Sequence, residues 1–265
     1  MSDAPRVLVV GASSGIGRSI ATTFVRAGAA VVFSARRAEA LADAVAEAGG
    51  GHAIPADVTV AGDAERLAGA VAAVLGGLDV VVYATGVSPL ARLTGLSEAD
   101  WLQVLNTNTV GFNAVARAVL PLLAGPAQVA AISSDSVGAP RPGLVHYAAS
   151  KAALEESIRG WRAEVPDVRW TTITVGATFP TEFGVHFDPV LMGELFADWS
   201  RLGIVHATLM DTDELADVIV DTLQTLARHP GIGAEDLVLR PASGIVADTA
   251  PMGDAAEANA AAAGA

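Results

Sequence analysis

Short apolar runs alternate along this chain with longer Ala- and Leu-rich stretches of helical periodicity. The runs are RVLVV at 6–10, AVVFS at 30–34, HAIPA at 52–56, DVVVYA at 79–84, QVAAIS at 128–133, RWTTITV at 169–175 and DLVLRP at 236–241. Nearly continuous apolar runs of this length are typical of parallel strands that are covered on both faces. The stretches of helical length between them include 15–28, 37–48, 61–76, 100–124 and 147–164. The alternation predicts an α/β fold, a doubly wound parallel sheet of about seven strands with helices on both faces.

The length and composition suit one domain. A chain of 265 residues, of which 52% are hydrophobic, is long enough to bury one sizeable core, and we expect a single domain over residues 1–250. Residues 252–265 are rich in alanine and lack large apolar anchors, so they are expected to form a mobile tail, with a frayed helix as the alternative. No apolar run approaches the roughly 18 residues of a membrane span, and a cytoplasmic protein without membrane contact is expected.

Charge and residue content exclude several classes of function. The net charge of -13 argues against nucleic acid as a partner, because binding to phosphates needs clustered Lys and Arg. The chain has no cysteine, and its five histidines show no metal-ligand spacing. We therefore expect no metal site.

Three glycines, Gly11, Gly15 and Gly17, follow the first apolar run and open the first helical stretch. In this position free N–H groups and the positive end of a helix dipole attract a phosphate, and residues without Cβ let it approach closely. The alternative is a tight strand-to-helix turn without a ligand, and the spacing G-x-x-x-G-x-G alone does not decide between them. The contacts expected for a bound dinucleotide come from Gly11, Ser13, Ser14, Gly15, Ile16 and Gly17.

A tyrosine and a lysine lie four residues apart at the start of a later helical stretch. Positions i and i+4 share one face of a helix, so the ammonium of Lys151 is expected beside the phenol of Tyr147 or beside a molecule bound next to it. A nearby cation favours phenolate and lowers the tyrosine pKa toward the working pH of an acid/base group. The alternative is an ordinary exposed Tyr/Lys pair.

Taken together, the motifs resemble those of the short-chain dehydrogenase/reductase family, and especially its NADP-dependent carbonyl reductases, over most of residues 6–245. The matching motifs, in chain order, are Gly11-x-x-x-Gly15-x-Gly17, Asp57-Val58, Asn108 in NTNTVG, Ser134 and Tyr147-x-x-x-Lys151. Ser134 precedes Tyr147 by 147 - 134 = 13 residues, the separation usual in that family.

The resemblance implies a role for each matching residue. Tyr147 would be the general acid/base, and Lys151 would bind the nicotinamide ribose and lower the pKa of the phenol. Ser134 would stabilise the substrate oxygen, and Asn108 would hold a water that links Lys151 to solvent. Asp57 would contact the adenine amino group, with Val58 against the ring.

Some of these residues keep other interpretations. Asn108 could bend or cap a helix, because asparagine often bonds locally to the backbone. Asp57 could be an exposed turn residue. Ser133 adjoins Ser134, so only the spacing assigns the role to the second serine.

The residues after the second strand bear on the choice of cofactor. An NAD-binding member carries an acid about 20 residues beyond the glycine loop. Here Ala35 lies at that place, 35 - 11 = 24 residues past the first glycine, followed by Arg36 and Arg37. Guanidinium groups suit a 2′-phosphate. NADP(H) is therefore expected, with Ser34 and Arg36 as its contacts, and NAD(H) is the alternative.

Two segments depart from the family pattern. The usual Asn-Asn-Ala-Gly after the fourth strand is Tyr83-Ala84-Thr85-Gly86 here, and the usual Pro-Gly after the sixth is Val175-Gly176. Gly86 and Gly176 are still expected to border the cofactor. The threonine that would bind the carboxamide corresponds to Thr178 or Thr181, and we assign it to Thr178.

The segment over about 179–210 resembles the substrate loop of the family. Its larger apolar residues are Phe179, Phe183, Phe187, Met192, Phe196 and Trp199. They suit an apolar or aromatic ketone or aldehyde, although an amphipathic helix packed on the core explains them equally.

The resemblance also implies a homo-oligomer, a dimer or tetramer, through helices around 102–123 and 148–164. The expected function is hydride transfer between a nicotinamide and a carbonyl or secondary alcohol. The alternatives are an NAD-dependent alcohol dehydrogenase and a cofactor-sensing protein without turnover.

Overall fold

A parallel sheet of seven strands forms the centre of the computed structural model, which describes residues 4–245. The strands are β1 (Arg6–Val10), β2 (Ala30–Ser34), β3 (His52–Ala53), β4 (Leu78–Tyr83), β5 (Leu123–Ser134), β6 (Arg169–Val175) and β9 (Asp236–Leu239). Their order is β3-β2-β1-β4-β5-β6-β9, and every neighbouring pair is parallel. The order changes direction between β1 and β4, and in such sheets ligands bind at the carboxyl ends of the strands beside that point.

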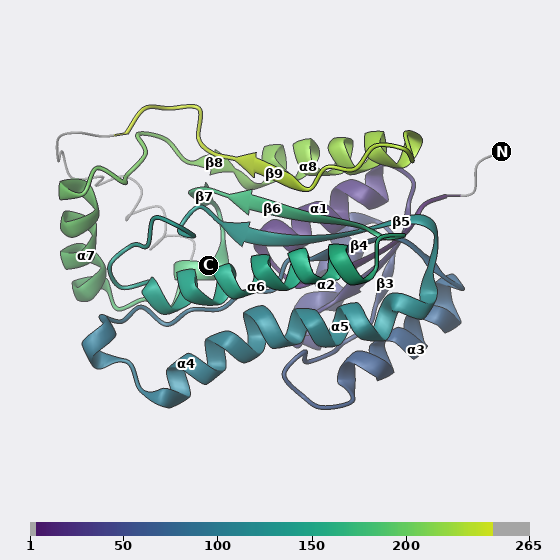
Figure 1. The fold of residues 1–265 in the computed structure, drawn as a ribbon, viewed down its shortest axis with the longest axis horizontal. Helices are drawn as coiled ribbons and strands as arrows, with labels where there is room; N and C mark the ends of the chain where they lie inside the picture. The colour runs from purple at the N-terminus through teal and green to yellow at the C-terminus, as the bar shows by residue number, and fades with distance from the viewer. Residues whose placement is uncertain (1–3, 246–265) are drawn as a thin grey trace.

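Helices cover both faces of the sheet, as the alternating pattern predicts. They are α1 (Gly15–Arg26), α2 (Ala38–Ala48), α3 (Asp63–Leu75), α4 (Glu98–Leu105), α5 (Gly111–Val119), α6 (Val145–Glu164), α7 (Pro189–Arg201) and α8 (Thr212–Arg228). One apolar core contains side chains of α1, α2 and α8, and a second contains side chains of α3, α5 and α6. In Figure 1, α5 and α6 cross in front of the sheet and α1 lies behind it. The doubly wound, Rossmann-like single-domain prediction is confirmed.

The central strands are continuously apolar because they serve both cores. In β1, Val7 and Val9 enter the first core, whereas Leu8 and Val10 enter the second. Successive side chains of a strand point to opposite faces, so a strand between two helical layers has no solvent-facing side. No helix among residues 4–245 is both long and apolar enough to cross a membrane.

The prediction of a single helix over 100–124 is wrong. After α4 the chain forms a π-helical segment, η2 (Asn106–Val110), then α5, then a short 3-10 turn, η3 (Leu120–Leu122). Proline lacks the N–H that would continue a helix, and Pro121 lies in the first turn of η3. The strand β5 begins directly afterwards, at Leu123. Two strands are shorter than predicted: β3 ends at Ala53 rather than at 56, and β9 ends at Leu239 rather than at 241.

The region beyond β6 contains structure that the pattern did not assign. A second, two-stranded sheet pairs β7 (Thr178–Phe179) with β8 (Met210–Asp211), and between them lie the 3-10 turn η4 (Glu182–Gly184) and helix α7. The expected substrate loop over 179–210 thus contains a helix, α7 (Pro189–Arg201), as the amphipathic alternative allowed. Helix α7 stands beyond the carboxyl ends of β5 and β6 (Figure 1). The expected tail at 252–265 lies outside the described residues.

Candidate active site

The glycine loop between β1 and α1 is closed by its own backbone. Gly11 has a φ of +92°, and a Cβ there would lie 2.7 Å from the backbone nitrogen of Thr85. A Cβ on Gly17 would collide with the carbonyl oxygen of Gly11. The amide of Gly11 donates to the carbonyl of Ser34 at 2.7 Å, which ties the loop to the end of β2. These two glycines are therefore required by the turn itself, whatever it binds.

The amino end of α1 borders a pocket and has no side-chain cap of its own. Its N-cap residue, Ser14, makes no side-chain capping bond, and the first turn holds no acidic residue. The guanidinium of Arg37 donates to the hydroxyls of Ser13 (3.3 Å) and Ser14 (3.2 Å). A pocket beside this end is lined by Ser14, Gly15, Arg18, Arg37, Phe179, Pro180, Thr181, Glu182, Val185 and His186. Free N–H groups, hydroxyls and guanidinium groups are the donors that a phosphate requires.

The two arginines after β2 differ in placement. Arg37 reaches the glycine loop, whereas Arg36 is exposed and bonds to none of the described residues. The side chain of Ser34 is fully buried, its Oγ has no hydrogen-bond partner, and it is not among the residues that line the pocket. The structure thus brings Arg37 to the loop, where the sequence suggested Ser34 and Arg36.

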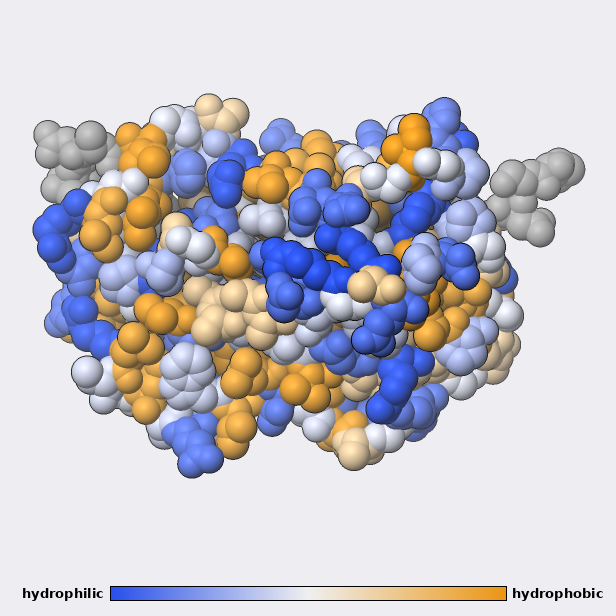
Figure 2. Space-filling model, viewed as in Figure 1, coloured by the Kyte–Doolittle hydropathy of each residue, from blue (hydrophilic) through white to orange (hydrophobic). Residues whose placement is uncertain are grey.

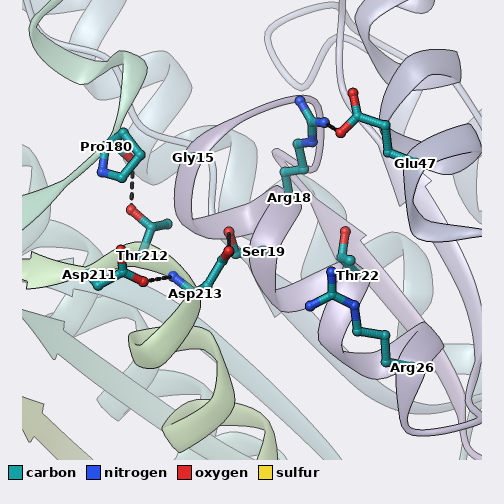
Figure 3. Close-up of a pocket in the computed structure, with 10 residues that line it drawn as sticks. All are labelled: Gly15, Arg18, Ser19, Thr22, Arg26, Glu47, Pro180, Asp211, Thr212 and Asp213. Atoms are coloured by element: carbon teal, nitrogen blue, oxygen red, sulfur yellow. Dashed lines mark hydrogen bonds and ion pairs between the residues drawn. The ribbon is translucent and has the colours of Figure 1, made fainter.

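A carboxylate from the segment after β7 meets the same arginine. Glu182 accepts from Arg37 at 2.5 Å. Burial raises the pKa of Glu182, but hydrogen bonds from Arg37 and Ser14 outweigh it and lower the pKa overall. The segment is fixed on its other side, because the hydroxyl of Thr212 donates to the carbonyl of Pro180 at 2.6 Å. Figure 3 shows this bond beside Gly15, in a pocket behind the loop where Arg18 pairs with Glu47.

Asp57 and Val58 follow β3 and border the second core. The carboxylate of Asp57 accepts from the backbone N–H of Thr59 at 2.9 Å and from its hydroxyl at 2.6 Å, which closes a local turn. Val58 is 9% exposed and packs in the second core, close to Gly111. Among residues 4–245, no three His, Asp or Glu side chains are placed to share a metal ion.

The tyrosine and the serine of the motif meet at the carboxyl end of β5. Tyr147, in the first turn of α6, faces the hydroxyl of Ser134, the last residue of β5, which can donate a hydrogen bond to the phenolate. Ser134 also accepts from the hydroxyl of Ser136 at 2.9 Å. Burial raises the pKa of Tyr147 to about 12, although the bond with Ser134 lowers it. Nearby, Asp135 and Arg141 form a bidentate ion pair at 2.7 and 2.9 Å.

Lys151 lies one helical turn beyond the tyrosine and is 2% exposed. Its Nζ donates to the carbonyl of Ile132 at 2.8 Å and stands 5.8 Å from the centroid of the Tyr147 ring. Burial lowers the pKa of Lys151 to about 8, against the charge of Glu155, which raises it. A Cβ on Gly86 would lie 3.3 Å from this Nζ, so the glycine leaves the space above the ammonium open.

The expected lowering of the tyrosine pKa by Lys151 is wrong for this state of the protein. The ammonium bonds to Ile132 on β5 rather than to the phenol, and burial of the tyrosine dominates its pKa. Desolvation disfavours the charged form of both groups, so it raises the pKa of an acid and lowers that of a base.

Asn108 lies within the π-helical segment and is fully buried. Its Oδ1 accepts from the N–H of Val87 at 2.9 Å, and its Nδ2 donates to the carbonyl of Val87 at 3.0 Å and to the hydroxyl of Ser150 at 2.9 Å. The side chain therefore joins η2 to α6 and to the chain after β4. Both protons of its amide are taken by protein atoms, which matches the local bonding kept open as an alternative.

The two adjacent serines have different partners. Ser133 donates to Glu155 of α6 at 2.6 Å, whereas Ser134 faces Tyr147. The structure therefore places the second serine, as the spacing suggested, beside the tyrosine.

The segments that depart from the family pattern are bonded internally. The hydroxyl of Tyr83 donates to the carbonyl of Thr107 at 2.5 Å, which ties β4 to the π-helical segment. The N–H of Gly176 donates to the carbonyl of Leu239 at 2.9 Å, and the hydroxyl of Thr178 donates to the carbonyl of Gly176 at 3.0 Å. Thr178 thus faces its own backbone, while Thr181 lines the pocket at the glycine loop.

A third apolar cluster covers the tyrosine. Its buried members are Leu144, Leu195 and Trp199, and the partly buried ones include Tyr147, Phe187 and Met192. Phe183 of η4 lies closest to the site, with its ring centroid 4.9 Å from that of Tyr147. The sequence singled out the aromatic residues of this segment, but it did not indicate Glu155, Glu182 or the pair Asp135–Arg141.

The comparisons with known sequences agree with this geometry. The profile of the family described as short chain dehydrogenase matches residues 5–188. Gluconate 5-dehydrogenase of Gluconobacter oxydans is 33% identical over 208 residues, which are 73% of this chain and 77% of that protein. Glycine betaine reductase of Emericella nidulans is 34% identical over 225 residues; these are 82% of this chain but 17% of that much longer protein.

A solved structure agrees as well. The RhlG/NADP active-site complex of Pseudomonas aeruginosa has a TM-score of 0.77 and 28% sequence identity. The match covers 91% of this chain and 97% of that one. The chain belongs to the short chain dehydrogenase family.

Proposed function

We propose that the protein is an NADP(H)-dependent oxidoreductase that interconverts a carbonyl compound and a secondary alcohol, with Tyr147 as the acid/base. The observation that carries this proposal is the placement of the Tyr147 phenol beside the hydroxyl of Ser134 and near the buried ammonium of Lys151. Two neighbouring hydroxyls next to a cation can hold a carbonyl oxygen and give it a proton. Membership of the family supports the same reaction class.

In the proposed reduction, each residue acts at a stated atom. Tyr147 gives its hydroxyl proton to the carbonyl oxygen, and Ser134 donates a hydrogen bond to the same oxygen as negative charge develops there. Lys151 binds the ribose beside the nicotinamide and favours loss of the tyrosine proton once its ammonium turns from Ile132. Asn108 holds α6 in register with the chain after β4. In the reverse direction Tyr147 takes the proton from the alcohol.

A nicotinamide cofactor supplies or accepts the hydride in this scheme. The amino end of α1, with Gly15, Ile16 and the hydroxyls of Ser13 and Ser14, would hold its pyrophosphate. Asp57 and Val58 would border the adenine, and Gly86, Gly176 and Thr178 would border the nicotinamide half. The donor set fits a dinucleotide, because it offers N–H groups, hydroxyls and guanidinium groups at a helix amino end.

The preference for NADP(H) rests on the charge after β2. No carboxylate follows that strand, and Ala35 is succeeded by Arg36 and Arg37. Arg37 already bonds to the loop hydroxyls, and Arg36 is exposed at the same turn. Among relatives, the RhlG/NADP complex names the same cofactor. We propose that a 2′-phosphate would take the place of Glu182 on Arg37.

The third apolar cluster suggests the substrate class. Phe183 packs against the ring of Tyr147, and Phe187 and Trp199 belong to the same apolar cluster. An apolar or aromatic ketone or aldehyde suits such an apolar surface.

We also propose a cytoplasmic homo-oligomer, a dimer or tetramer, that forms through α4, α5 and α6. Leu102 and Val110 in this region leave 49% and 56% of their surface exposed.

A direct assay tests this proposal. Oxidation of NADPH and of NADH is followed by absorbance against aromatic, aliphatic and cyclic ketones and aldehydes, while calorimetry measures the binding of each cofactor alone. Turnover that prefers NADPH is the expected result. Turnover with a preference for NADH would make the protein an NAD-dependent alcohol dehydrogenase. Tight cofactor binding without turnover across the panel would indicate a cofactor sensor and contradict the proposal.

A further inference from the structure

Helix α6 carries a third ionisable side chain on the face of Tyr147 and Lys151. Glu155 lies four residues after Lys151, as Lys151 lies four after Tyr147, so the three side chains share one face. The side chain of Glu155 is 14% exposed, and its Oε1 accepts from the hydroxyl of Ser133 at 2.6 Å. The neighbouring Glu156 has a side chain that is 75% exposed and pairs with Arg159.

Two consecutive residues of β5 hold the two side chains. The Nζ of Lys151 donates to the carbonyl of Ile132, and the hydroxyl of Ser133 donates to Glu155. Because the two bonds start one helical turn apart on α6 and end on adjacent strand residues, they fix the helix against the strand in both position and rotation. Ser134, which faces Tyr147, is the next residue of the same strand.

Glu155 also supplies the charge that opposes the desolvation of Lys151. Burial lowers the pKa of this lysine, and the carboxylate of Glu155 raises it. On α6, Arg159 approaches the other oxygen of Glu155, at 3.9 Å. After β5, Asp135 and Arg141 neutralise each other and act on the pKa of Tyr147 instead. From the π-helical segment, the neutral amide of Asn108 approaches Gly86, as does the ammonium of Lys151.

We propose that Glu155 is a positioning residue, held by Ser133, that keeps the ammonium of Lys151 charged and in place beside Tyr147. The effect of Glu155 on the catalytic rate rests on the proposed function. Its effect on the protonation of Lys151 does not. Without the carboxylate, less charge offsets the desolvation, and the buried ammonium loses its proton at a lower pH. The proton chemistry of Tyr147 then lacks its cation over part of the working range.

The composition of the chain allows a direct titration. Lys151 is the only lysine among the 265 residues, so lysine labelled with ¹³C at Cε gives one side-chain resonance from the intact protein. We compare the wild type with Glu155→Gln and, as the matched control, Glu156→Gln. The side chain of Glu156 is 75% exposed. Figure 2 shows a hydrophilic band across the middle of the face on which α6 lies. No cofactor or substrate is needed.

In Glu155→Gln the resonance is expected to titrate about 1 pH unit or more below the wild type, because loss of an adjacent opposite charge moves a pKa by about that much. Glu156→Gln should titrate with the wild type. Ser133→Ala should shift in the same direction by less, and Glu155→Asp, which keeps the charge, should restore most of the difference. Equal titration of Glu155→Gln and the wild type would overturn the proposal.

The catalytic consequence is tested by pH profiles of kcat and KM. The basic limb of the kcat profile should move to lower pH in Glu155→Gln, with KM for the carbonyl substrate nearly unchanged. A uniform loss of kcat at every pH would indicate a merely structural role and contradict the proposal. A shifted lysine resonance in a protein that turns over no carbonyl compound would contradict the proposed function and leave Glu155 in its role toward Lys151.

Discussion

At the scale of single residues, the site buries the side chain of Lys151, and burial disfavours its charged form. Lys151 is 2% exposed, and burial lowers its pKa from 10.5 to about 8. The folded protein therefore binds this proton less tightly than the unfolded chain does. The free-energy cost is fully present below pH 8, and it disappears as the pH rises toward 10.5, where the unfolded chain also loses the proton.

This cost predicts a pH dependence of stability. Relative to Lys151→Met, the wild type should gain about 2 kcal/mol in its free energy of unfolding between about pH 7 and 9.5, since one unit of pKa shift corresponds to about 1.4 kcal/mol. Urea denaturation of both proteins at the two pH values measures the gain. Tyr147→Phe serves as a control, because it keeps the lysine and should follow the wild type over this range. A constant difference between wild type and Lys151→Met would contradict the assignment.

The arginine pair after β2 gives a second prediction at this scale. Arg37→Ala should weaken the binding of NADPH by about 10-fold or more and that of NADH little, because a hydrogen bond to a charged group contributes about 1.5–3 kcal/mol. Arg36→Ala, the matched neighbour, should have the smaller effect, since its side chain does not meet the loop hydroxyls. Calorimetric dissociation constants decide the matter. If only Arg36→Ala lost affinity for NADPH, the 2′-phosphate contact would belong to Arg36, as the sequence suggested.

The sequence predicted which residue types form the site, but not which neighbouring element each side chain faces. The 13-residue spacing selected Ser134, and the structure places that serine against Tyr147. The spacing could not indicate that Ser133 faces α6, because strand alternation fixes a face only once the neighbouring helix is known. For the same reason, neither Arg37 nor Glu155 stood out from its exposed neighbour in the sequence.

At the scale of elements, the short turn η4 connects the two halves of the site. Glu182 bonds to Arg37 at the glycine loop, and the next residue, Phe183, packs on Tyr147. Any movement of this turn therefore changes the surroundings of both the loop and the tyrosine. Neither contact follows from the pattern of the segment, since each joins residues more than thirty positions apart in the chain.

The π-helical segment gives a prediction about one side chain. Asn108→Ala should lower the free energy of unfolding by about 2–3 kcal/mol, because it leaves the N–H and carbonyl of Val87 without partners in the interior. Asn106→Ala, in the same segment but exposed, should change stability by less than about 0.5 kcal/mol. Chemical denaturation measures both. A similar loss in the two variants would mean that the segment, rather than the amide of Asn108, carries the effect.

At the scale of the whole molecule, two cores on the sheet are separate from the apolar cluster under α7. The sheet cores follow from continuous apolar runs such as VLVV in β1, which is why the fold was predictable. Helices α7 and α8 were not assigned. Yet α8 begins at Asp211, whose carboxylate accepts from the N–H groups of Asp213 and Glu214, and such a cap is visible in sequence. The π-helical turn within 100–124 had no comparable signal, because such a turn depends on its tertiary contacts.

A pair of leucine substitutions separates these cores. Leu154 and Leu195 are both fully buried, the first in a sheet core and the second under α7. Leu154→Ala should lower global stability by about 2–5 kcal/mol. Leu195→Ala should instead speed hydrogen exchange in α7 and raise KM for an apolar substrate, with a smaller change in global stability. Equal global losses would show that the α7 cluster unfolds together with the sheet.

The central claim is that Tyr147 is the acid/base of a nicotinamide-dependent carbonyl reduction. The measurement that tests it most directly is kcat for Tyr147→Phe with NADPH and a ketone that the wild type reduces, alongside the dissociation constant for NADPH. The account predicts a loss of kcat of about 10²- to 10⁴-fold with an almost unchanged dissociation constant, since only the transferable proton is removed. A variant that keeps wild-type kcat would contradict it.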